Sequence, residues 1–157
     1  MFLLDSTVVV KWFKEGEEYE KEATELRKRI LSSQVEAAAS ELMPLEVCRA
    51  LMKAGYDSAR VRRAYATLTE MVELGFLKLV PVSSTSSSAS EGIIGLGLYV
   101  ADALVLAAAL SISADLVTED KHLLKQSVHK RMSQGSLRVL RLRDLGGPKQ
   151  QDGETTP

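Results

Sequence analysis

The residues from 93 to 112 form an almost uninterrupted apolar run, IIGLGLYVADALVLAAALSI, in which Asp102 is the single charged residue. About twenty such residues are enough to span a bilayer. The chain has no Lys or Arg between Lys78 and Lys121, however, so the cationic residues expected at the ends of a membrane span are missing. The glycines near the start of the run favour a helix that begins after them. The run therefore predicts a buried core helix of a soluble domain, in which the Asp102 carboxylate is costly unless it is paired or bound to a cation.

Length and composition predict one ordinary globular domain. The chain has 157 residues, of which 45% are hydrophobic and 26% are charged, and its net charge is −1. This charge gives no overall attraction to nucleic acid, so a polyanionic partner needs a local basic patch. The single cysteine, Cys48, cannot form an intrachain disulfide, and the opening MFLLDSTVVV lacks the features of a signal peptide. We expect a cytoplasmic protein without a membrane segment, with a domain at 1–144 and a disordered polar tail at 145–157.

Short apolar runs alternate with amphipathic segments along the chain. The pattern predicts helices at 17–30, 40–55, 58–74 and 98–112, a short helix at 121–126, and strands at 2–4, 35–40, 76–80, 114–118 and 137–142. The segment 6–13 has a helical start signal, but its valines favour a strand. The Ser-rich segment 83–90 predicts a flexible loop. This alternation indicates an α/β domain with a mainly parallel sheet, whose ligands bind outside the carboxyl ends of the strands.

Four acidic residues interrupt apolar patterns, and they are Asp5, Glu46, Asp102 and Asp120. Periodicity places all four where burial is expected, and buried carboxylates that converge raise one another's pKa. A divalent cation would relieve both costs, and carboxylate oxygens are what Mg²⁺ and Mn²⁺ prefer. The pattern therefore predicts a metal site.

Each of these acids also has a purely structural explanation. Asp5 is positioned to cap the segment that follows it, and Glu46 to pair with Arg49 on an exposed helix face. Asp120 is a candidate N-cap for the next helix, and its neighbour Glu119 competes for the same role. Asp102 is the hardest to explain in this way, because no basic residue is near it in the sequence.

The order of these motifs resembles that of PIN-domain nucleases, and within that family the small VapC-type toxins. The motifs are LLDSTVVVKWF (3–13), ELMPLEVCRAL (41–51), YVADALVLAAAL (99–110) and ADLVTEDKHLL (114–124). The resemblance covers about residues 1 to 142, and its strength comes from the order and spacing of the motifs together. It implies a single three-layer α/β/α domain around a mainly parallel sheet.

The resemblance also implies a role for each matching residue. The four acids match the family's acidic quartet, with Asp5, Asp102 and Asp120 as metal ligands and Glu46 as a ligand or water-orienting acid. They would hold one or two Mg²⁺ or Mn²⁺ ions for cleavage of RNA. Thr118 matches the family's hydroxyl residue before the last acid, and the remaining matches are Ser6 and Thr7, which are also candidate helix caps. The two histidines match no family position, and His122 is expected on the surface.

Two basic clusters are candidates for contact with RNA. One lies between Lys121 and Arg143, a stretch with seven Lys or Arg residues and no Asp or Glu. The other lies around the helix of Glu46 and the helix after it, and consists of Arg49, Lys53, Arg60, Arg62 and Arg63. We take Arg49, Lys53, Lys121 and Lys125 as candidate RNA-binding residues, although solvated helix faces explain them equally well. The apolar Trp12 fits either the core or a groove for a partner.

The combined interpretation is a metal-dependent endoribonuclease, the toxin of a toxin–antitoxin pair. The resemblance implies a small antitoxin partner, a homodimer and an RNA substrate such as tRNA. One alternative is an RNA-processing nuclease without an antitoxin. Another is a catalytically silent RNA-binding module of the same fold.

Overall fold

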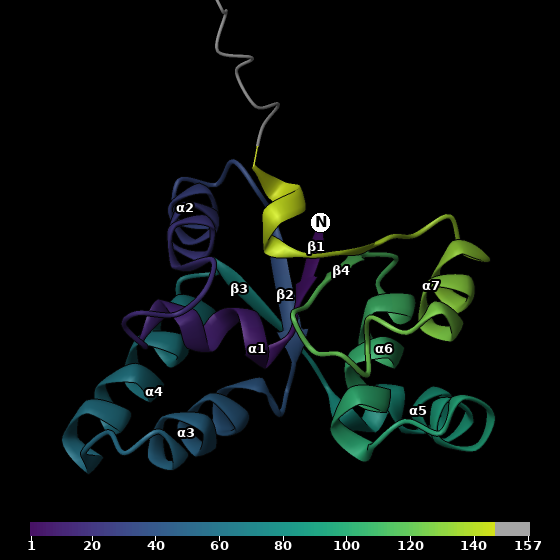
Figure 1. The fold of residues 1–157 in the computed structure, drawn as a ribbon, viewed down its shortest axis with the longest axis horizontal. Helices are drawn as coiled ribbons and strands as arrows, with labels where there is room; N and C mark the ends of the chain where they lie inside the picture. Colours follow the sequence, from purple (N-terminus) through teal and green to yellow (C-terminus); the bar gives the residue numbers. More distant parts are fainter. Residues whose placement is uncertain (147–157) are drawn as a thin grey trace, which may run out of the picture.

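The computed structural model describes residues 1–146 of the protein (Figure 1). With η for a 3-10 helix, the elements in chain order are β1 (Phe2–Leu4), α1 (Ser6–Val9), η1 (Val10–Trp12), α2 (Glu20–Leu31), β2 (Ala37–Ser40), α3 (Met43–Lys53), α4 (Ser58–Glu73), β3 (Leu77–Val80), α5 (Val82–Leu96), α6 (Val100–Ser111), β4 (Asp115–Val117), α7 (Gln126–Ser133), β5 (Val139–Leu140) and η2 (Leu142–Leu145).

The strands form one sheet in the order β3-β2-β1-β4-β5, and every pair of neighbours is parallel. The chain leaves β1 toward β2 and β3 on one side, and later returns to place β4 and β5 on the other. The strand order therefore reverses between β1 and β4. In parallel sheets such a reversal opens a crevice at the carboxyl ends of the two strands, which is where ligands bind.

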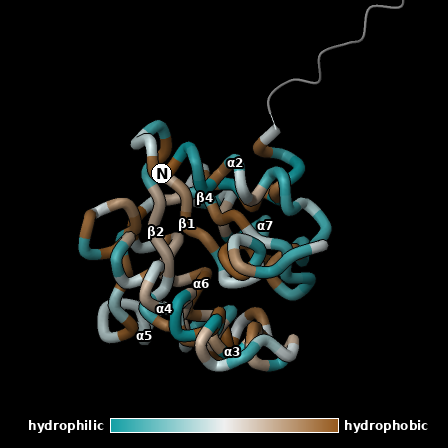
Figure 2. Tube along the Cα trace, turned by 90° about the vertical axis from the view of Figure 1, so that its left-hand side faces the viewer, coloured by the Kyte–Doolittle hydropathy of each residue, from teal (hydrophilic) through white to brown (hydrophobic). Residues whose placement is uncertain are grey.

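Helices cover both faces of the sheet, so the fold has three layers, as the sequence predicts. Helices α1 to α4 lie on one face, and α5 to α7 lie on the other (Figure 1). Side chains alternate across β1, where Leu4 enters the first hydrophobic core and Leu3 enters the second. The hydropathy colouring shows brown segments in the interior strands and in α6 (Figure 2). Helix α6 is buried over most of its surface, as its sequence predicts.

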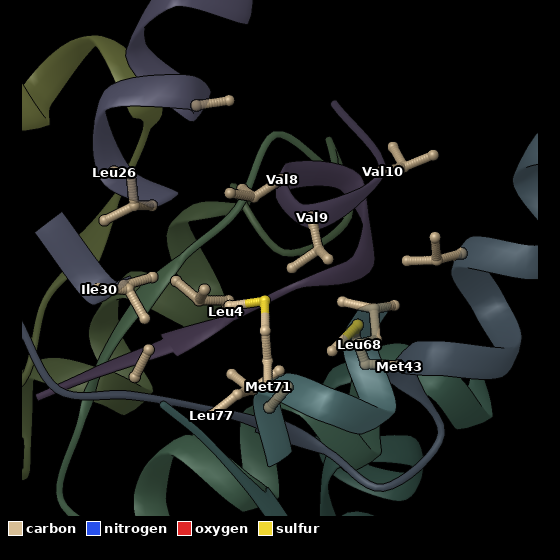
Figure 3. Packing of buried hydrophobic residues seen from close by; sticks show 14 of the residues in the cluster. Leu4, Val8, Val9, Val10, Leu26, Ile30, Met43, Leu68, Met71 and Leu77 are labelled. Carbon is tan, nitrogen blue, oxygen red and sulfur yellow. The ribbon is translucent and has the colours of Figure 1, made fainter. Parts of the chain in front are cut away.

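The first core fixes α1 directly over the end of β1. Val8 and Val9 of α1 are fully buried, and they belong to one cluster with Leu4, Met43 and Leu68 from three other elements (Figure 3). Packing of this kind holds side chains in single rotamers and transmits small displacements. The short helix that follows Asp5 is therefore held by its valines, although valine alone favours strands.

The Ser-rich segment 83–90 is helical, so the prediction of a loop is wrong. It forms most of α5, which begins after Pro81. The hydroxyls of Ser84 and Thr85 donate to the carbonyl oxygen of Pro81, and Ser90 donates to Ser87. These bonds stay within the helix instead of competing with it. The small side chains let α5 approach α6 closely, and a Cβ built on Gly92 would lie 3.5 Å from that of Ala103.

The prediction of a short helix at 121–126 is also wrong. Residues 121–124 form a turn, in which the Leu124 amide donates to the carbonyl oxygen of Asp120. The backbone is extended at Lys125, and helix α7 begins at Gln126. The helix predicted from Ser40 starts later, at Met43, with Pro44 in its first turn. The other predicted strands and helices are present, with bounds that shift by a few residues.

In residues 1–146, no single helix has both the length and the apolar character to cross a membrane. Helices α5 and α6 meet the criterion only as a bent pair, with 120° between them. Leu145 packs against the first core. The rest of the predicted tail, from residue 147 on, lies outside the described residues.

Candidate active site

The first and last acids of the predicted quartet follow the two strands that flank the reversal. Leu4 is paired with Val117, so Asp5 and Thr118 emerge side by side from β1 and β4. The Asp5 amide donates to the Val117 carbonyl oxygen over 3.0 Å, which continues the strand pairing by one residue. The crevice at the sheet's carboxyl edge therefore contains Asp5 and, two residues beyond Thr118, Asp120.

The Asp5 carboxylate is buried, with 4% of the residue exposed, and two hydroxyls hold it. Thr7 Oγ1 and Thr118 Oγ1 donate to the same oxygen, Oδ2, over 2.5 and 2.8 Å. Burial raises the pKa of Asp5, and the charge of Asp120 raises it further, whereas the two hydroxyl hydrogen bonds lower it. Asp5 is the N-cap residue of α1 by backbone conformation, but its side chain accepts no capping bond from that helix. The structural explanation of Asp5 as a side-chain cap is therefore wrong.

Asp120 is held both through its backbone and through its side chain. Its amide donates to Thr118 Oγ1 over 3.0 Å, and its Oδ1 accepts the His122 amide over 2.6 Å. The neighbouring Glu119 carboxylate binds Arg141, whose Nε donates to Oε2 over 2.9 Å. Because Glu119 is held by this ion pair, Asp120 is the acid that faces the other carboxylates. The two neighbouring acids thus have different surroundings, with Glu119 bound to Arg141 and Asp120 beside the other acids.

Asp102 enters the site from the first turn of α6, and Tyr99 is the N-cap residue of that helix. Burial raises the pKa of Asp102 to about 6, with further contributions from the charges of Asp120 and Asp5. His122 and Lys125 act in the opposite direction. The acid in the apolar run is therefore half-buried against two other acids, and its nearest positive groups come from the segment after β4.

Glu46 enters from the first turn of α3, which is a distant part of the chain. Burial raises its pKa to about 7, and the charges of Asp5, Asp102 and Asp120 raise it further. Its Oε2 atom is buried and has no hydrogen-bond partner. In residues 1–146 no ion pair joins Glu46 to Arg49, so the helix-face pairing that the sequence allowed is absent. The charges of the other three acids of the predicted quartet thus all act on Glu46.

Four mutually repelling carboxylates are a donor set that suits a hard divalent cation. Oxygen-only ligands with several free lone pairs are the preference of Mg²⁺ and Mn²⁺. The buried, unpartnered Oε2 of Glu46 is the observation that fits such an ion best, because a buried charged atom without a partner is costly. As the side chains stand in residues 1–146, no three His, Cys, Asp or Glu residues are gathered tightly enough to form a ready-made cluster.

The candidate RNA-binding residues lie in different places around these acids. Arg49 and Lys53 line an open, mostly apolar groove of about 490 Å³ together with Ser6 and Glu46. Lys125 is exposed and close enough to Asp102 to lower its pKa. Lys121 is exposed on the turn after Asp120. Three of the four residues, and Ser6, therefore lie beside the carboxylates.

Arg60, which the sequence grouped with Arg49, lies elsewhere. It pairs with Glu15 and lines a separate pocket of about 310 Å³ that also contains Trp12. Trp12 packs against the first core, and its Nε1 donates to the Ala23 carbonyl oxygen over 3.0 Å. Trp12 therefore packs against the core and also lines that pocket.

Sequence reasoning missed an aromatic pair at the rim of the site. The rings of Tyr99 and His122 meet edge to face, with 5.2 Å between centroids and 86° between planes. Tyr99 is 68% exposed, and His122 is close enough to Asp102 to lower the pKa of that carboxyl. The residues are 23 positions apart, and no periodicity joins them, so only the turn after Asp120 brings them together.

Solved structures with the same fold come from proteins of low sequence identity. A toxin–antitoxin complex from Klebsiella pneumoniae matches with a TM-score of 0.61 at 18% identity, over 90% of this chain and 98% of that one. FitAB bound to a DNA fragment matches with a TM-score of 0.63 at 13% identity, over 90% and 95%. VapBC2 from Rickettsia felis, bound to a promoter DNA fragment, matches with a TM-score of 0.56 at 16% identity, over 89% and 97%. No curated protein sequence matches this chain.

The family model of the PIN domain matches residues 2–128, which include all four acids. This range covers most of the chain, from the first strand into α7. The parallel sheet and the helices on both of its faces agree with that match. The resemblance seen in the motifs is thus confirmed, and the chain belongs to the PIN domain family.

Proposed function

We propose that the protein is a metal-dependent endoribonuclease that acts as the toxin of a toxin–antitoxin pair. PIN domains are generally nucleases and generally use divalent metal ions. The observation that carries the proposal for this chain is the convergence of Asp5, Glu46, Asp102 and Asp120 at the reversal of strand order. Burial, and after it the charges of the converging acids, raise the pKa of Glu46 to about 7 and that of Asp102 to about 6.

Each residue of the site has a role in this proposal. Asp5, Asp102 and Asp120 hold one or two Mg²⁺ or Mn²⁺ ions, and Glu46 binds an ion or orients a water molecule. When bound, such an ion lowers the pKa of a water molecule and stabilises negative charge on a phosphodiester oxygen. Thr7 and Thr118 fix the orientation of the Asp5 carboxylate through their hydroxyl hydrogen bonds.

Positive side chains next to the acids would guide the phosphates of the RNA. Arg49 and Lys53 flank the groove beside Glu46, and Lys125 lies on the other side near Asp102. Contacts with phosphates position a nucleic acid but carry no sequence information. Their charge is local, which suits a chain whose net charge is only −1.

The experiment that tests the activity is cleavage of bulk tRNA with Mg²⁺ or Mn²⁺ added, and again with the ions chelated. The wild type is compared with Asp102→Asn, which keeps the size of the side chain but removes its charge. We expect metal-dependent cleavage by the wild type and a loss of at least about a hundredfold in the variant, because a metal ligand is lost.

The control is Glu91→Gln, which removes an exposed acid from α5 and should cleave as the wild type does. Equal cleavage by the wild type and Asp102→Asn would contradict the proposed site. Folded wild type that binds RNA without metal and cleaves none of it would favour the catalytically silent module instead. Metal-dependent cleavage by a protein whose gene has no small antitoxin gene beside it would leave the RNA-processing nuclease as the better description.

An antitoxin and a second copy of the chain are the proposed protein partners. One of the similar structures is described as a toxin–antitoxin complex, which supports the first. The test is to purify the product of a small gene adjacent to this one and titrate it into the cleavage reaction. We expect inhibition that is complete at stoichiometric amounts. A binding partner that leaves cleavage unchanged would contradict the proposal.

A further inference from the structure

Two hydroxyls connect the Asp5 carboxylate to the backbone of the loop after β4. Thr7 Oγ1, which donates to Asp5 Oδ2, accepts the Glu119 amide over 3.1 Å. Thr118 Oγ1, which donates to the same oxygen, accepts the Asp120 amide over 3.0 Å. The backbone amides of Glu119 and Asp120 therefore hold the two threonine hydroxyls in place, and these hydroxyls orient the Asp5 carboxylate. The same two residues of backbone also place the Asp120 side chain.

The Glu119 side chain fastens that loop to the segment after β5. Its Oε1 accepts the Leu142 amide over 2.8 Å, and its Oε2 accepts Arg141 Nε over 2.9 Å and Arg141 Nη2 over 2.5 Å. Only 9% of the Glu119 side chain is exposed. Charge-assisted bonds to a partly desolvated carboxylate are stronger than those between exposed ions. Strand β5 has two residues, so these bonds supply much of the attachment at this end of the sheet's edge.

Arg141 is itself held from two further directions. Its guanidinium lies over the Tyr19 ring, 5.6 Å from the ring centroid, at the residue that precedes α2. Its backbone amide donates to Asp144 Oδ2 over 2.8 Å at the start of η2. Arg141 therefore joins the loop after β4, the residue before α2 and the start of η2. Of these three parts, only the loop after β4 carries an acid of the proposed metal site, and Arg141 contacts that loop through Glu119.

We propose that Arg141 is a positioning residue for the acidic site, acting through Glu119 and the loop amides on Asp5 and Asp120. Without the guanidinium, the mostly buried Glu119 carboxylate keeps only the Leu142 amide as a donor. It therefore moves toward water. The Glu119 amide then leaves Thr7, and the Asp5 carboxylate loses one of the two hydroxyls that orient it. The proposal rests on the proposed function only in that the positioned carboxylates are taken as metal ligands.

The chain contains a matched ion pair at the opposite end of the same two strands. Asp115, the first residue of β4, accepts the Arg138 amide over 2.8 Å and binds the Arg138 guanidinium through Nε and Nη2 over 3.0 and 2.6 Å. The pattern of donors is the same as at Glu119, and it also fastens β4 to β5. This pair is far from the carboxyl ends of the strands, so its loss should not reach the acids.

The test compares Arg141→Met with Arg138→Met. The first readout is hydrogen exchange of the Glu119 and Asp120 amides, measured by NMR without metal. We expect exchange of both amides to become at least about tenfold faster in Arg141→Met and to change less than twofold in Arg138→Met, because only the first pair orders the loop. Arg141→Lys, which keeps the charge but not the paired geometry, should lie between the wild type and Arg141→Met.

The second readout is Mn²⁺ affinity, measured by EPR of the free ion. We expect affinity to fall by about tenfold or more in Arg141→Met, which is usual when a residue that orients a ligand is lost, and to stay within twofold in Arg138→Met. Unchanged amide exchange in Arg141→Met overturns the inference, as does an equal effect of the two variants. Wild type that binds no Mn²⁺ overturns the proposed function instead, while the exchange experiment still decides the role of Arg141.

Discussion

Single carboxylates carry the information that connects this sequence to a site. The charge of Glu46 on an amphipathic helix is ordinary, and only its environment makes it unusual. In the folded chain its burial, together with the charges of the three other acids, raises its pKa to about 7, and its Oε2 has no hydrogen-bond partner. The pattern of acids in apolar contexts predicted the four positions. It did not predict which of their neighbours hold them, because Thr7 and Glu119 act through contacts across more than a hundred residues.

The raised pKa of Glu46 gives a prediction for stability without metal. A carboxyl whose pKa is higher in the folded than in the unfolded state binds more protons when folded. The free energy of unfolding therefore falls as the pH rises from the pKa of Glu46 in the unfolded chain toward its pKa in the folded chain, about 7. We expect the free energy of unfolding of the wild type in a chelator to decrease between about pH 4.5 and pH 7.5, and Glu46→Gln to remove on the order of 2 kcal/mol of that decrease. Urea unfolding across this range measures both. Equal slopes for the two proteins would contradict the pKa.

At the scale of elements, α5 is where sequence patterns were least informative. Serine dominates its first half, and this composition predicts a loop, but the hydroxyls bond within the helix and the small residue Gly92 packs against α6. Helix–helix packing therefore overrides weak intrinsic preference. The same packing fixes the direction in which α6 begins, and with it the place of Asp102.

Two glycines at the end of α5 predict opposite effects of the same substitution. Gly95 lies in the helix with nothing within 4 Å of an added Cβ, so Gly95→Ala should stabilise the fold by about 0.5–1 kcal/mol. Gly97 ends the helix at φ +63°, where a side chain is strained, so Gly97→Ala should destabilise it by about 1 kcal/mol. Thermal unfolding of both variants tests the pair. A stabilising Gly97→Ala would contradict the left-handed conformation of Gly97 at the end of α5.

At the scale of the whole molecule, the corner between α5 and α6 exposes apolar side chains next to the acidic site. Ile94, Tyr99 and Val100 are 78%, 68% and 63% exposed. Apolar residues gathered on a surface indicate a place of association more often than isolated ones do. Because the corner leads directly into the helix that carries Asp102, a second copy bound there would border the site.

We therefore expect the protein to dimerise through this corner, and Ile94→Glu to make it monomeric at micromolar concentration. Burying the new carboxylate at an interface without a partner is unfavourable. Light scattering after size-exclusion chromatography measures the mass. The control is Leu74→Glu, which changes another exposed apolar residue, just after α4, and should leave the dimer intact. A monomeric wild type, or a dimer that survives Ile94→Glu, would contradict the expectation.

The sequence by itself determined the parallel α/β order, the buried character of α6 and the four acidic positions. These follow from local patterns, since apolar periodicity decides what is buried and an acid within such a pattern is costly. Only the tertiary structure decided that Glu119 is held away from the other acids, that 83–90 is a helix, and that Arg141 binds Glu119. Each of these depends on contacts between segments far apart in the chain, such as the bonds from Glu119 to Arg141 and Leu142, and no local pattern specifies such contacts.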